Sequence, residues 1–512
     1  MSLSSRWKKE ELVYNDEPEQ WHDPKQFMNM QDCVDKFKEH VNKNSSIAIF
    51  ADRDMDGIGA GAILSSILQD IGIPHYTHVP HRNEKYGLQP KHIVDFHEKG
   101  IDLLITVDNG CNAFQALKMA KDIGINIIIT DHHNLQDGER YDFPMISPHD
   151  GRYPCPYLCG GVMALKFGQV LLDEYHFPKD YWKRYLDYAC LTTIGDSMPL
   201  LGENRWIVKQ GLSKMNTNPS LPIKQMIDKS NYITKGQIDE KTIGWSIVPP
   251  ITATGRVDHP KLGYDFLMNE KKDDFSFYEV VSEKQKEKIS HTNDDKLSEI
   301  ECVLSDIGYA IVQGFPEGVL NLIANKLAEK NNRPFIVLQR DKDNETVIGS
   351  ARSRREYDLY AFIMSLPSMY FDARGGHREA VGFTIYDEFL NQFVQEVKQA
   401  KVESESVLVY HYDIAVNAIQ DSIMDDIEKN KPYGMKYPMP RYVLRNVKIE
   451  GIRKYGNKTY AYAWEDANSI PVVFGQALDK NDFKKNVDLL FEFDRSKKGD
   501  IRCNVVDWRL SV

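Results

Sequence analysis

The stretch from Ile47 to Gly57, IAIFADRDMDG, constrains the fold of this chain more than any other. A short apolar run that ends in a charged loop is typical of a buried parallel strand, seen at its C-terminal tip. The small-residue sequence GIGAGAILSSIL begins at Gly57 and predicts a helix that packs close to a sheet. Because ligand sites in open α/β sheets lie at such strand tips, the loop between strand and helix is a candidate functional site.

Three carboxylates, Asp52, Asp54 and Asp56, occupy alternate positions in this loop. Carboxylates this close raise each other's pKa unless a cation stabilises their charged forms, so the pattern predicts a metal site. An EF-hand is one alternative, but Ile63 stands where that loop needs a bidentate Glu, and a strand rather than a helix precedes the loop. The other alternative is an acidic helix N-cap without a metal, which the helix dipole would favour.

Two further strand patterns end in the same way. IDLLITVDNG carries Asp108 at its tip, and INIIITDHHN carries Asp131, His132 and His133. Helical sequence separates the strands, as in the βαβ units of a parallel sheet, so we expect all three tips at one sheet edge. Asp196, in GDSMP, is predicted at a helix end, where it would be either a further ligand or a turn aspartate.

The residue types at this edge point to a class of chemistry. Carboxylates and imidazoles together in a dry cleft suit Mn²⁺ or Mg²⁺ better than zinc alone, and enough of them are present for two ions. Two ions about 3.5–4 Å apart are a common device for hydrolysing phosphate esters. The sequence therefore predicts a two-metal phosphoesterase.

Composition limits the class of protein. At 512 residues the chain is expected to hold about three domains, and a hydrophobic share of 42% suffices for their cores. No run of about 18 apolar residues is present and no apolar segment opens the chain, so we expect no membrane association and a cytoplasmic location. Seven scattered cysteines fit a reducing compartment. A net charge of −11 means that any nucleic-acid binding must come from a local patch or a metal-lined groove.

The second half of the chain carries glycines next to basic residues. Lys/Glu-rich sequence from about 282 to 305 predicts a solvated connecting helix. Beyond it lie IGSARS, with Arg352, and ARGGHREAVGF, with Gly375, Gly376 and His377. Glycines let a backbone approach phosphates while neighbouring side chains supply charge, although Gly-Gly often marks just a turn.

The stretch from Lys429 to Tyr462 is basic and aromatic, with nine Lys or Arg residues, six tyrosines and Glu450 as its only acid. The strand-like runs YVLRNVKI, KTYAYAWE, IPVVFG and VDLLFEF predict a small closed β-barrel. An OB-fold that stacks single-stranded bases on its aromatic side chains is a natural candidate. The alternative is that the tyrosines serve only as strand formers.

These motifs together resemble the DHH phosphoesterase superfamily, and within it the RecJ-type single-strand exonucleases, over nearly the whole chain. The matching motifs are DRDMDG, HRNEKYGL, VDNG, TDHH, GDSMPLLGENR, IGSARS and GGHREAVGF. The resemblance implies an α/β fold class with a parallel-sheet DHH domain, a long connecting helix, a smaller α/β DHH-associated domain and a C-terminal OB-like β-barrel. The expected bounds are 1–280 for the DHH domain with an N-terminal extension, 281–305 for the helix, 306–402 for the DHH-associated domain and 403–512 for the barrel.

The resemblance also implies roles for individual residues. Two Mn²⁺ ions, with Mg²⁺ as a substitute, would be held by Asp54, Asp56, Asp108, His132 and Asp196, with Asp108 as the bridge. The catalytic set would be Asp52, Asp131 and His133, of which the last two orient ligands and the attacked phosphate. Arg82 and Tyr86 would contact DNA. Phosphates near the 5′ end would be held by Arg256, Ser350, Arg352 and His377, with Gly375 and Gly376 beside them.

Three functions fit these motifs to different degrees. The leading one is hydrolysis of single-stranded DNA from its 5′ end in DNA repair or recombination, by a monomer that receives its strand from a helicase or a single-strand-binding protein. A DHH phosphodiesterase for short oligonucleotides or small nucleotides is the second, but such relatives are typically shorter and lack an OB-like domain. An inactive replication scaffold is the third, and a scaffold has no physical need of a clustered negative site.

The sequence departs from the family pattern in two places. Pro250 and Thr252, in PPITATGR, stand where the family usually has Arg and Asn, which puts part of the strand-binding contact in doubt. From Phe315 the usual His-Pro-Gly has become Phe-Pro-Glu-Gly. Neither change touches the acidic motifs, so we expect activity with an altered grip on the strand or an altered substrate range.

Overall fold

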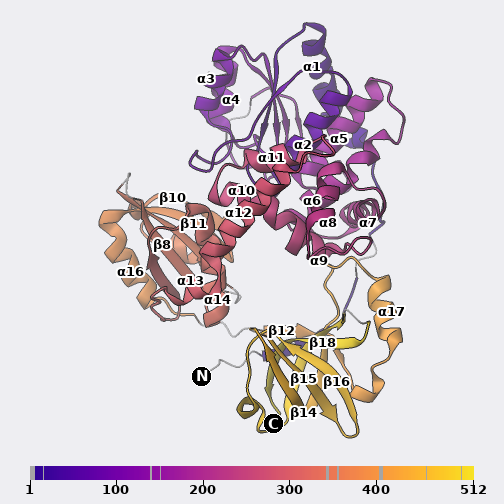
Figure 1. Ribbon diagram of the computed structural model, residues 1–512. Coiled ribbons are helices and arrows are strands. Elements are labelled where there is room, and N and C mark those ends of the chain that lie inside the picture. The colour runs from indigo at the N-terminus through magenta and orange to yellow at the C-terminus, as the bar shows by residue number, and fades with distance from the viewer. Residues whose placement is uncertain are drawn as a thin grey trace. The chain divides into compact units, whose positions relative to one another are not determined.

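The structure is a computed structural model, and it describes residues 6–14, 17–138, 141–149, 151–341, 345–353, 357–402, 407–456, 458–496 and 499–511. The chain divides into two compact units (Figure 1). The larger unit spans residues 17–402, and the smaller one combines residues 1–16 with residues 403–512. No helix among the described residues is long and apolar enough to cross a membrane.

A five-stranded parallel sheet begins the larger unit. Its strands lie in the order β3 (Tyr76–His78), β2 (Ile47–Ala51), β4 (Leu103–Val107), β5 (Asn126–Thr130) and β6 (Met145–Ile146). β2 and β4 are buried along their whole length, which explains why their sequences are continuously apolar rather than alternating. The parallel sheet predicted from the strand patterns is confirmed.

Helices cover both faces of this sheet (Figure 1). They are α1 (Met30–Asn42), α2 (Met55–Asp70), α3 (Pro90–Glu98), α4 (Phe114–Ile123) and α5 (Gly160–Glu174). On one face, Ile93 of α3 and Leu117 of α4 belong to the same buried cluster as Phe50 of β2. On the other face α2 lies very close to its neighbours, because a Cβ added at Gly61 would be 3.0 Å from the Ala51 Cβ. The glycines of the small-residue run are therefore a packing requirement.

A set of helices follows the parallel sheet and leads to the second half of the unit. They are α6 (Leu186–Gly195), α7 (Gly202–Thr217), α8 (Leu221–Lys229), α9 (Glu240–Thr242), a π-helical turn (Ile243–Ile247), α10 (Val248–Val257), α11 (Lys261–Leu267), α12 (Ser276–Thr292) and α13 (Asp294–Ser298). The helix expected over 281–305 differs, because α12 begins earlier and ends at Thr292. Asn293 has extended backbone angles and its side chain accepts from the Lys296 N–H, so it caps a separate helix.

A second, mixed sheet lies in the same unit. Its strands lie in the order β10 (Phe371–His377), β11 (Ala380–Tyr386), β9 (Thr346–Arg352), β8 (Phe335–Asp341) and β7 (Gly308–Val312). Only the β7–β8 pair among these described strands is parallel. Helices α14 (Leu320–Asn331), α15 (Leu359–Ser365) and α16 (Leu390–Gln399) supply residues to its two buried clusters. This α/β arrangement agrees with the expected fold class.

The smaller unit is a closed five-stranded barrel. Its strands follow one another round the barrel in the order β14 (Tyr442–Tyr455), β15 (Lys458–Glu465), β16 (Asn468–Phe474), β18 (Ile501–Leu510) and β17 (Val487–Arg495). The barrel closes because β14 pairs with β17 through residues 442–447 and with β15 through residues 448–455. The predicted barrel is confirmed. Helix α17 (Asp421–Lys429) and the short strand β13 (Tyr412–Asp413) precede it.

The N-terminal strand lies with the barrel rather than with the parallel sheet. β1 (Arg6–Lys9) pairs in parallel with β12 (Val407–Tyr410). The Trp7 indole also donates a hydrogen bond to Asp507 of β18, at 2.8 Å. Residues 1–16 therefore belong to the smaller unit and not, as the resemblance implies, to an extension of the DHH domain. A four-residue strand carries no sequence signal that identifies so distant a partner.

Candidate metal centre and arginine cluster

The register of the parallel sheet brings the three acidic tips together. Ala51, Val107 and Thr130 are the last residues of β2, β4 and β5, and they pair with one another in register. Asp52, Asp108 and Asp131 are the residues that immediately follow. All three are almost completely buried, with exposed fractions of 1% or 2%. The predicted convergence of the tips at one sheet edge is therefore present in the structure.

His132 lies at the centre of the acidic cluster. Its Nε2 is 3.1 Å from Asp108 Oδ1, 3.5 Å from Asp56 Oδ2 and 3.7 Å from Asp196 Oδ2. Three overlapping groups each bring their ligand atoms within 4.8 Å of one another. They are Asp56, His132 and Asp196; Asp52, Asp54 and Asp108; and Asp108, His132 and His133. All five predicted metal ligands are in these groups, together with Asp52 and His133, and the role of each stays a prediction.

Two helix N-termini hold the acids in place. Asp54 is the N-cap of α2 and accepts from the N–H groups of Asp56 at 3.0 Å and Gly57 at 3.1 Å. Asp56 in turn accepts from the N–H groups of Gly160 and Gly161 at the start of α5, the second at 2.8 Å. Asp54 is therefore an N-cap, as one alternative expected, but this capping role does not account for the rest of the cluster and does not decide whether a metal binds.

Gly160 and Gly161 were not identified from the sequence. A Cβ added at Gly160 would lie 2.4 Å from the Asp108 Cβ, and one at Gly161 would lie 2.3 Å from Thr192 Oγ1. These glycines let α5 approach the acidic loop closely enough for its N–H groups to reach Asp56. The sequence CGGVM offers only a weak signal, a glycine pair just before a predicted helix. Asp108 itself has a φ of 62°, a left-handed conformation that is rare outside glycine and typical of strained functional positions.

The electrostatics of the cluster favour a bound cation. Burial, followed by the repulsion of Asp54, raises the pKa of Asp52 to about 7. Burial, followed by Asp56 and Asp54, raises the pKa of Asp196 to about 8, and burial and Asp56 raise the pKa of Asp108 well above its usual value. Each shift means that an isolated carboxylate is disfavoured there.

Unpartnered atoms support the same conclusion. Asp52 Oδ2, Asp108 Oδ1 and Asp196 Oδ2 are buried and accept no hydrogen bond of good geometry from the described residues, although His132 Nε2 lies 3.1 Å from Asp108 Oδ1. Buried carboxylate oxygens normally have partners, because an unsatisfied one is costly. Oxygen donors with one or two imidazoles are also the ligand set that Mn²⁺ and Mg²⁺ accept. The residues present therefore fit divalent ions.

The Asp131 and His133 pair stands beside the cluster. Asp131 Oδ1 lies 2.8 Å from His133 Nδ1, and Asp131 Oδ2 accepts from the Cys111 N–H at 2.9 Å. The hydrogen bond to Asp131 raises the pKa of His133 to about 9. Burial raises the pKa of Asp131, but the hydrogen bond to His133 and the contact with Cys111 outweigh it and lower that pKa to about 2. His133 is thus held in one orientation by a charged partner.

Three half-buried arginines, Arg82, Arg256 and Arg352, form a cationic cluster, and Asp54 of the acidic loop acts electrostatically on Arg256. Burial, followed by Arg82 and Arg352, lowers the pKa of Arg256 to about 10. Burial also lowers the pKa of Arg82 and of Arg352. Arg82 Nε is buried without a hydrogen-bond partner among the described residues. Arg256 is anchored, since its Nη1 donates to Gly318 O at 3.1 Å and to Asn321 Oδ1 at 2.9 Å. Half-buried guanidinium groups that form no ion pair with a described carboxylate suit phosphate oxygens.

The second sheet carries the remaining predicted residues. Ser350 and Arg352 lie on β9, and β11 separates this strand from β10 with Gly375, Gly376 and His377. Through β11 the register places Gly375 level with Ser350, and His377 level with Arg352. Ser350 is buried, whereas the three β10 residues are exposed. The register thus aligns the two motifs on one sheet without direct strand pairing.

The two departures from the family pattern have local explanations. The Thr252 hydroxyl donates within α10, to Val248 O and Pro249 O, so it is occupied by the helix backbone. Gly318, the glycine of Phe-Pro-Glu-Gly, packs tightly against α10. A Cβ added at Gly318 would lie only 2.3 Å from the Arg256 carbonyl oxygen. The shifted glycine still permits the contact that anchors Arg256.

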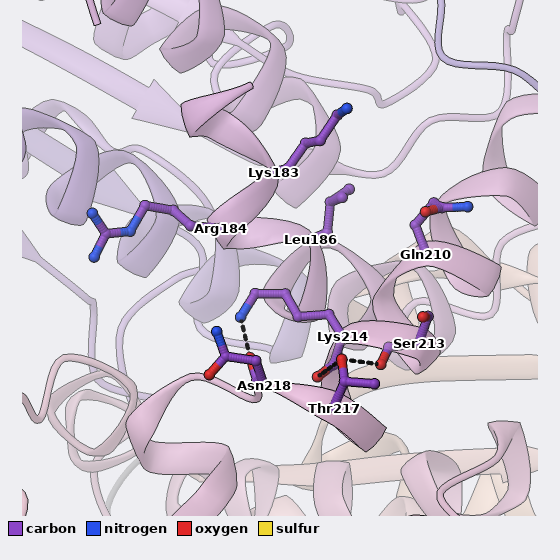
Figure 2. A pocket seen from close by; sticks show the side chains of 8 residues that line it. All are labelled: Lys183, Arg184, Leu186, Gln210, Ser213, Lys214, Thr217 and Asn218. Atoms are coloured by element: carbon purple, nitrogen blue, oxygen red, sulfur yellow. Dashed lines mark hydrogen bonds between the residues drawn. The ribbon is translucent and has the colours of Figure 1, made fainter. Parts of the chain in front are cut away.

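A pocket of about 340 Å³ lies away from the acidic cluster (Figure 2). It is lined by Lys183, Arg184 and Leu186 on one side, and by residues of α7 and Asn218 on the other. None of the predicted site residues lines it. Its cations have partners: Lys183 pairs with Asp180 at 2.9 Å, and Lys214 donates to Asn218 O at 2.9 Å. A further group, His78, Glu84 and His92, has metal-ligand composition, but His92 Nε2 is only 2.8 Å from Glu84 and forms a hydrogen bond with it. Neither place competes with the acidic cluster as the candidate site.

Comparisons with known proteins agree with this arrangement. Residues 46–193 match the profile of the DHH family, N-terminal domain; residues 305–403 match the DHHA1 domain; and residues 410–501 match the RecJ OB domain. A single-stranded-DNA-specific exonuclease RecJ from Bacillus subtilis is 30% identical over 460 residues, which cover 86% of this chain and 57% of that protein. The chain thus spans little more than half the length of this relative.

Two solved structures share the fold. RecJ from Thermus thermophilus in complex with Mn²⁺ has a TM-score of 0.81 at 18% identity, covering 95% of this chain and 72% of that one. Its complex with Mg²⁺ has a TM-score of 0.74 at 17% identity, covering 95% and 71%. At these identities the likeness concerns the fold.

Gly160→Ala is expected to weaken Mn²⁺ binding by about 10- to 100-fold, the usual effect of disturbing groups that orient metal ligands. The physical reason is the 2.4 Å approach to the Asp108 Cβ, which forces Asp108 or α5 to move. Isothermal titration calorimetry measures the affinity. Gly475→Ala is the control, because a Cβ there meets no atom within 4 Å. Equal Mn²⁺ affinity in both variants would contradict the assigned role of the α5 N-terminus.

Proposed function

We propose that this chain, which belongs to the RecJ-type branch of the DHH family, hydrolyses single-stranded DNA from its 5′ end and releases 5′ nucleotides. The main observation in support of the proposal is that the larger unit contains both an acidic cluster and an arginine cluster, which have opposite charges. Buried carboxylates with unpartnered oxygens favour bound cations, and the half-buried arginine cluster, on which Asp54 acts electrostatically, favours an anion. A phosphodiester between metal ions and arginines satisfies both needs.

The residues that would hold divalent ions are Asp54, Asp56, Asp108, His132 and Asp196, and Asp108 would be common to both ions. Bound Mn²⁺ or Mg²⁺ would activate a water molecule and stabilise the charge that develops on the phosphate. The chain's own contribution is to fix the donors: the N-terminus of α2 orients Asp54, and the N-terminus of α5 orients Asp56. Asp52, next to these ligands, shares the group with Asp54 and Asp108.

The neighbouring side chains would bind and orient the phosphate. Asp131 engages His133 through Nδ1, so Nε2 is the ring nitrogen left for a phosphate oxygen. Arg82 and Tyr86 would contact the strand, and Arg256 and Arg352 would neutralise phosphates near its 5′ end. Tyr86 as a residue is 54% exposed, while burial of its phenol group, followed by the nearby Asp52, raises the pKa of that phenol. Tyr86 thus combines a ring open to a base with a hydroxyl at the acids.

The barrel would hold the strand beyond the metal centre. The structure separates the tyrosines of the basic aromatic stretch: Tyr433, Tyr437 and Tyr442 are buried. On β15 the burial alternates, so that Tyr460, Tyr462 and Trp464 are exposed on one face. We call these three side chains the aromatic ladder. Residues two apart on a strand are about 6.5–7 Å apart, a spacing that suits successive bases of an extended single strand.

The biological setting follows from the same proposal. DNA repair and recombination generate single strands with 5′ ends, and a helicase or a single-strand-binding protein is the kind of partner that delivers them. Two competing functions make different predictions. A phosphodiesterase for short oligonucleotides would not need the aromatic ladder, and an inactive scaffold would bind DNA without hydrolysing it.

Asp108→Ala is expected to lower the hydrolysis rate by at least about 1000-fold, because the proposed shared ligand is lost from both ions. The measurement is release of nucleotides from 5′- and 3′-labelled single-stranded DNA with Mn²⁺, which also reports the direction of degradation. Glu98→Ala, which removes an exposed acid, is the control. A near wild-type rate for Asp108→Ala would refute the metal assignment, and an inactive wild-type chain that binds DNA would support the scaffold.

Arg352→Glu is expected to lower the rate on 5′-phosphorylated strands by about 100-fold, and on 5′-hydroxyl strands by much less. The reason is that a lost charged hydrogen bond to the terminal phosphate is replaced by repulsion. Rates on the two matched substrates provide the measurement. Arg340→Glu, on the adjacent strand β8 and exposed to solvent, is the control. Equal losses on both substrates would mean that Arg352 does not read the 5′ phosphate.

Replacing the aromatic ladder by alanine, in Tyr460→Ala/Tyr462→Ala/Trp464→Ala, is expected to weaken binding of long single strands by at least about 100-fold. Strands of two to four nucleotides should lose less than about threefold. Affinities for strands of increasing length at two salt concentrations test this, with Tyr412→Ala as an exposed aromatic control in the same unit. Equal losses at every length would favour the small-substrate phosphodiesterase. A truncated chain made for the same purpose should consist of residues 17–402. Removing the barrel alone would leave β1 without its partner β12, so residues 1–16 must be removed together with residues 403–512.

A further inference from the structure

Arg53 lies between two predicted metal-site residues, yet its side chain contacts a different part of the chain. Its Nη1 donates to the carbonyl oxygens of Arg82 at 2.7 Å, of Glu84 at 3.0 Å and, at a longer 3.4 Å, of His81. The centre of its guanidinium group is also 5.4 Å from the centroid of the Tyr86 ring. One side chain of the acidic loop therefore contacts four residues within a single short segment.

Glu84 holds the same segment together through hydrogen bonds to residues within it and just after it. Its carboxylate accepts from the His81 N–H at 2.6 Å, from Lys91 Nζ at 2.8 Å and, on the same oxygen, from His92 Nε2 at 2.8 Å. His92 Nδ1 accepts from the Gln89 N–H at 3.0 Å, so the ring proton is on Nε2 and faces Glu84. The segment thus folds around Glu84, and Arg53 attaches the folded segment to the acidic loop.

Residues 79–89 form neither a helix nor a strand. No ladder of backbone hydrogen bonds therefore fixes the directions of the side chains in this stretch. Hydrogen bonds from a charged donor are about twice as strong as neutral ones, and an arginine offers several donors in one rigid plane. Arg53 and Glu84 supply the main charged contacts to this stretch that could hold it in one conformation.

We infer that Arg53 is a positioning residue, which holds the segment His81–Tyr86 in the conformation that presents Arg82 and Tyr86 to single-stranded DNA. The inference rests on the proposed function, because it requires those two side chains to contact the strand. Arg53 acts through the segment: its Nη1 is directed at carbonyl oxygens, and the side chain is partly buried. A protein whose binding conformation is less populated binds its ligand more weakly in the same proportion.

The first test measures the segment without DNA and without metal. Hydrogen exchange of the full chain in EDTA is followed for wild type, Arg53→Ala and Lys85→Ala. Arg53→Ala is expected to speed exchange at least about tenfold in residues 81–89 and to leave the strands of the parallel sheet unchanged. Lys85→Ala removes an exposed charge from the same segment and is expected to leave exchange unchanged. Unchanged exchange in Arg53→Ala, or faster exchange throughout the sheet, would overturn the inference.

The second test is a mutant cycle on the affinity for single-stranded DNA, also in EDTA. Arg53→Ala alone is expected to weaken binding by about tenfold. In a chain that already carries Arg82→Ala and Tyr86→Ala, the same change is expected to cost less than about twofold, because its effect passes through those residues. A full tenfold loss in both backgrounds would mean that Arg53 contacts the DNA directly, and the positioning role would be wrong.

The two tests also separate this inference from the proposed function. If the wild-type chain does not bind single-stranded DNA, the proposed function fails, while hydrogen exchange still shows whether Arg53 orders the segment. If the wild-type chain binds and degrades DNA but Arg53→Ala leaves both exchange and affinity unchanged, only the positioning role fails.

Discussion

The mutual repulsion of buried carboxylates at the strand tips is the constraint on which the larger unit depends. The parallel register brings Asp52, Asp108 and Asp131 to one edge, where burial penalises their charges. Only part of this cost is offset inside the chain, by N–H groups at helix N-termini and by the pairing of Asp131 with His133. The remainder leaves a site whose charged form a cation would stabilise.

The packing of α2 and α5 against the acidic cluster partly offsets the cost of burying its charges. Helix dipoles act over about one turn, so α2 and α5 must bring their first residues within hydrogen-bond distance of the acids. Glycine is required where α5 does so, since a side chain at Gly160 would collide with Asp108. Arg256 has its own anchor, because its Nη1 donates a hydrogen bond to Gly318 O. The larger unit thus contains an acidic cluster and a basic cluster, each with its own anchoring contacts.

The sequence predicted the parts of this arrangement that follow from local periodicity. Apolar runs ending in acids identified β2, β4 and β5, and parallel pairing was enough to place their tips together. The roles of Gly160 and Arg53 were not predictable in this way. Gly160 is needed because of a helix that follows more than a hundred residues after Asp52, and Arg53 looks like a spacer between two acids. Contacts that depend on the tertiary approach of distant elements leave little trace in a local pattern.

The bounds of the elements show the same limit. Lys/Glu-rich sequence predicted one helix across 281–305, but Asn293 caps a new helix and the two are separate. Likewise, nine basic residues and six tyrosines predicted a nucleic-acid surface without showing which face of the barrel carries it. The alternation of burial along β15 shows that Tyr460, Tyr462 and Trp464 lie on the outer side of this strand, which the closure of the barrel decides.

The pairing of β1 with β12 has a consequence for the order in which the protein is made. Nearly four hundred residues separate Lys9 from Val407. At about 5–20 residues per second, a ribosome needs roughly 20–80 s to add the missing partner strand. Throughout that time Trp7 and its neighbours have no barrel to join, while the parallel sheet can already form. The smaller unit can therefore be completed only after translation has passed through the whole of the larger one.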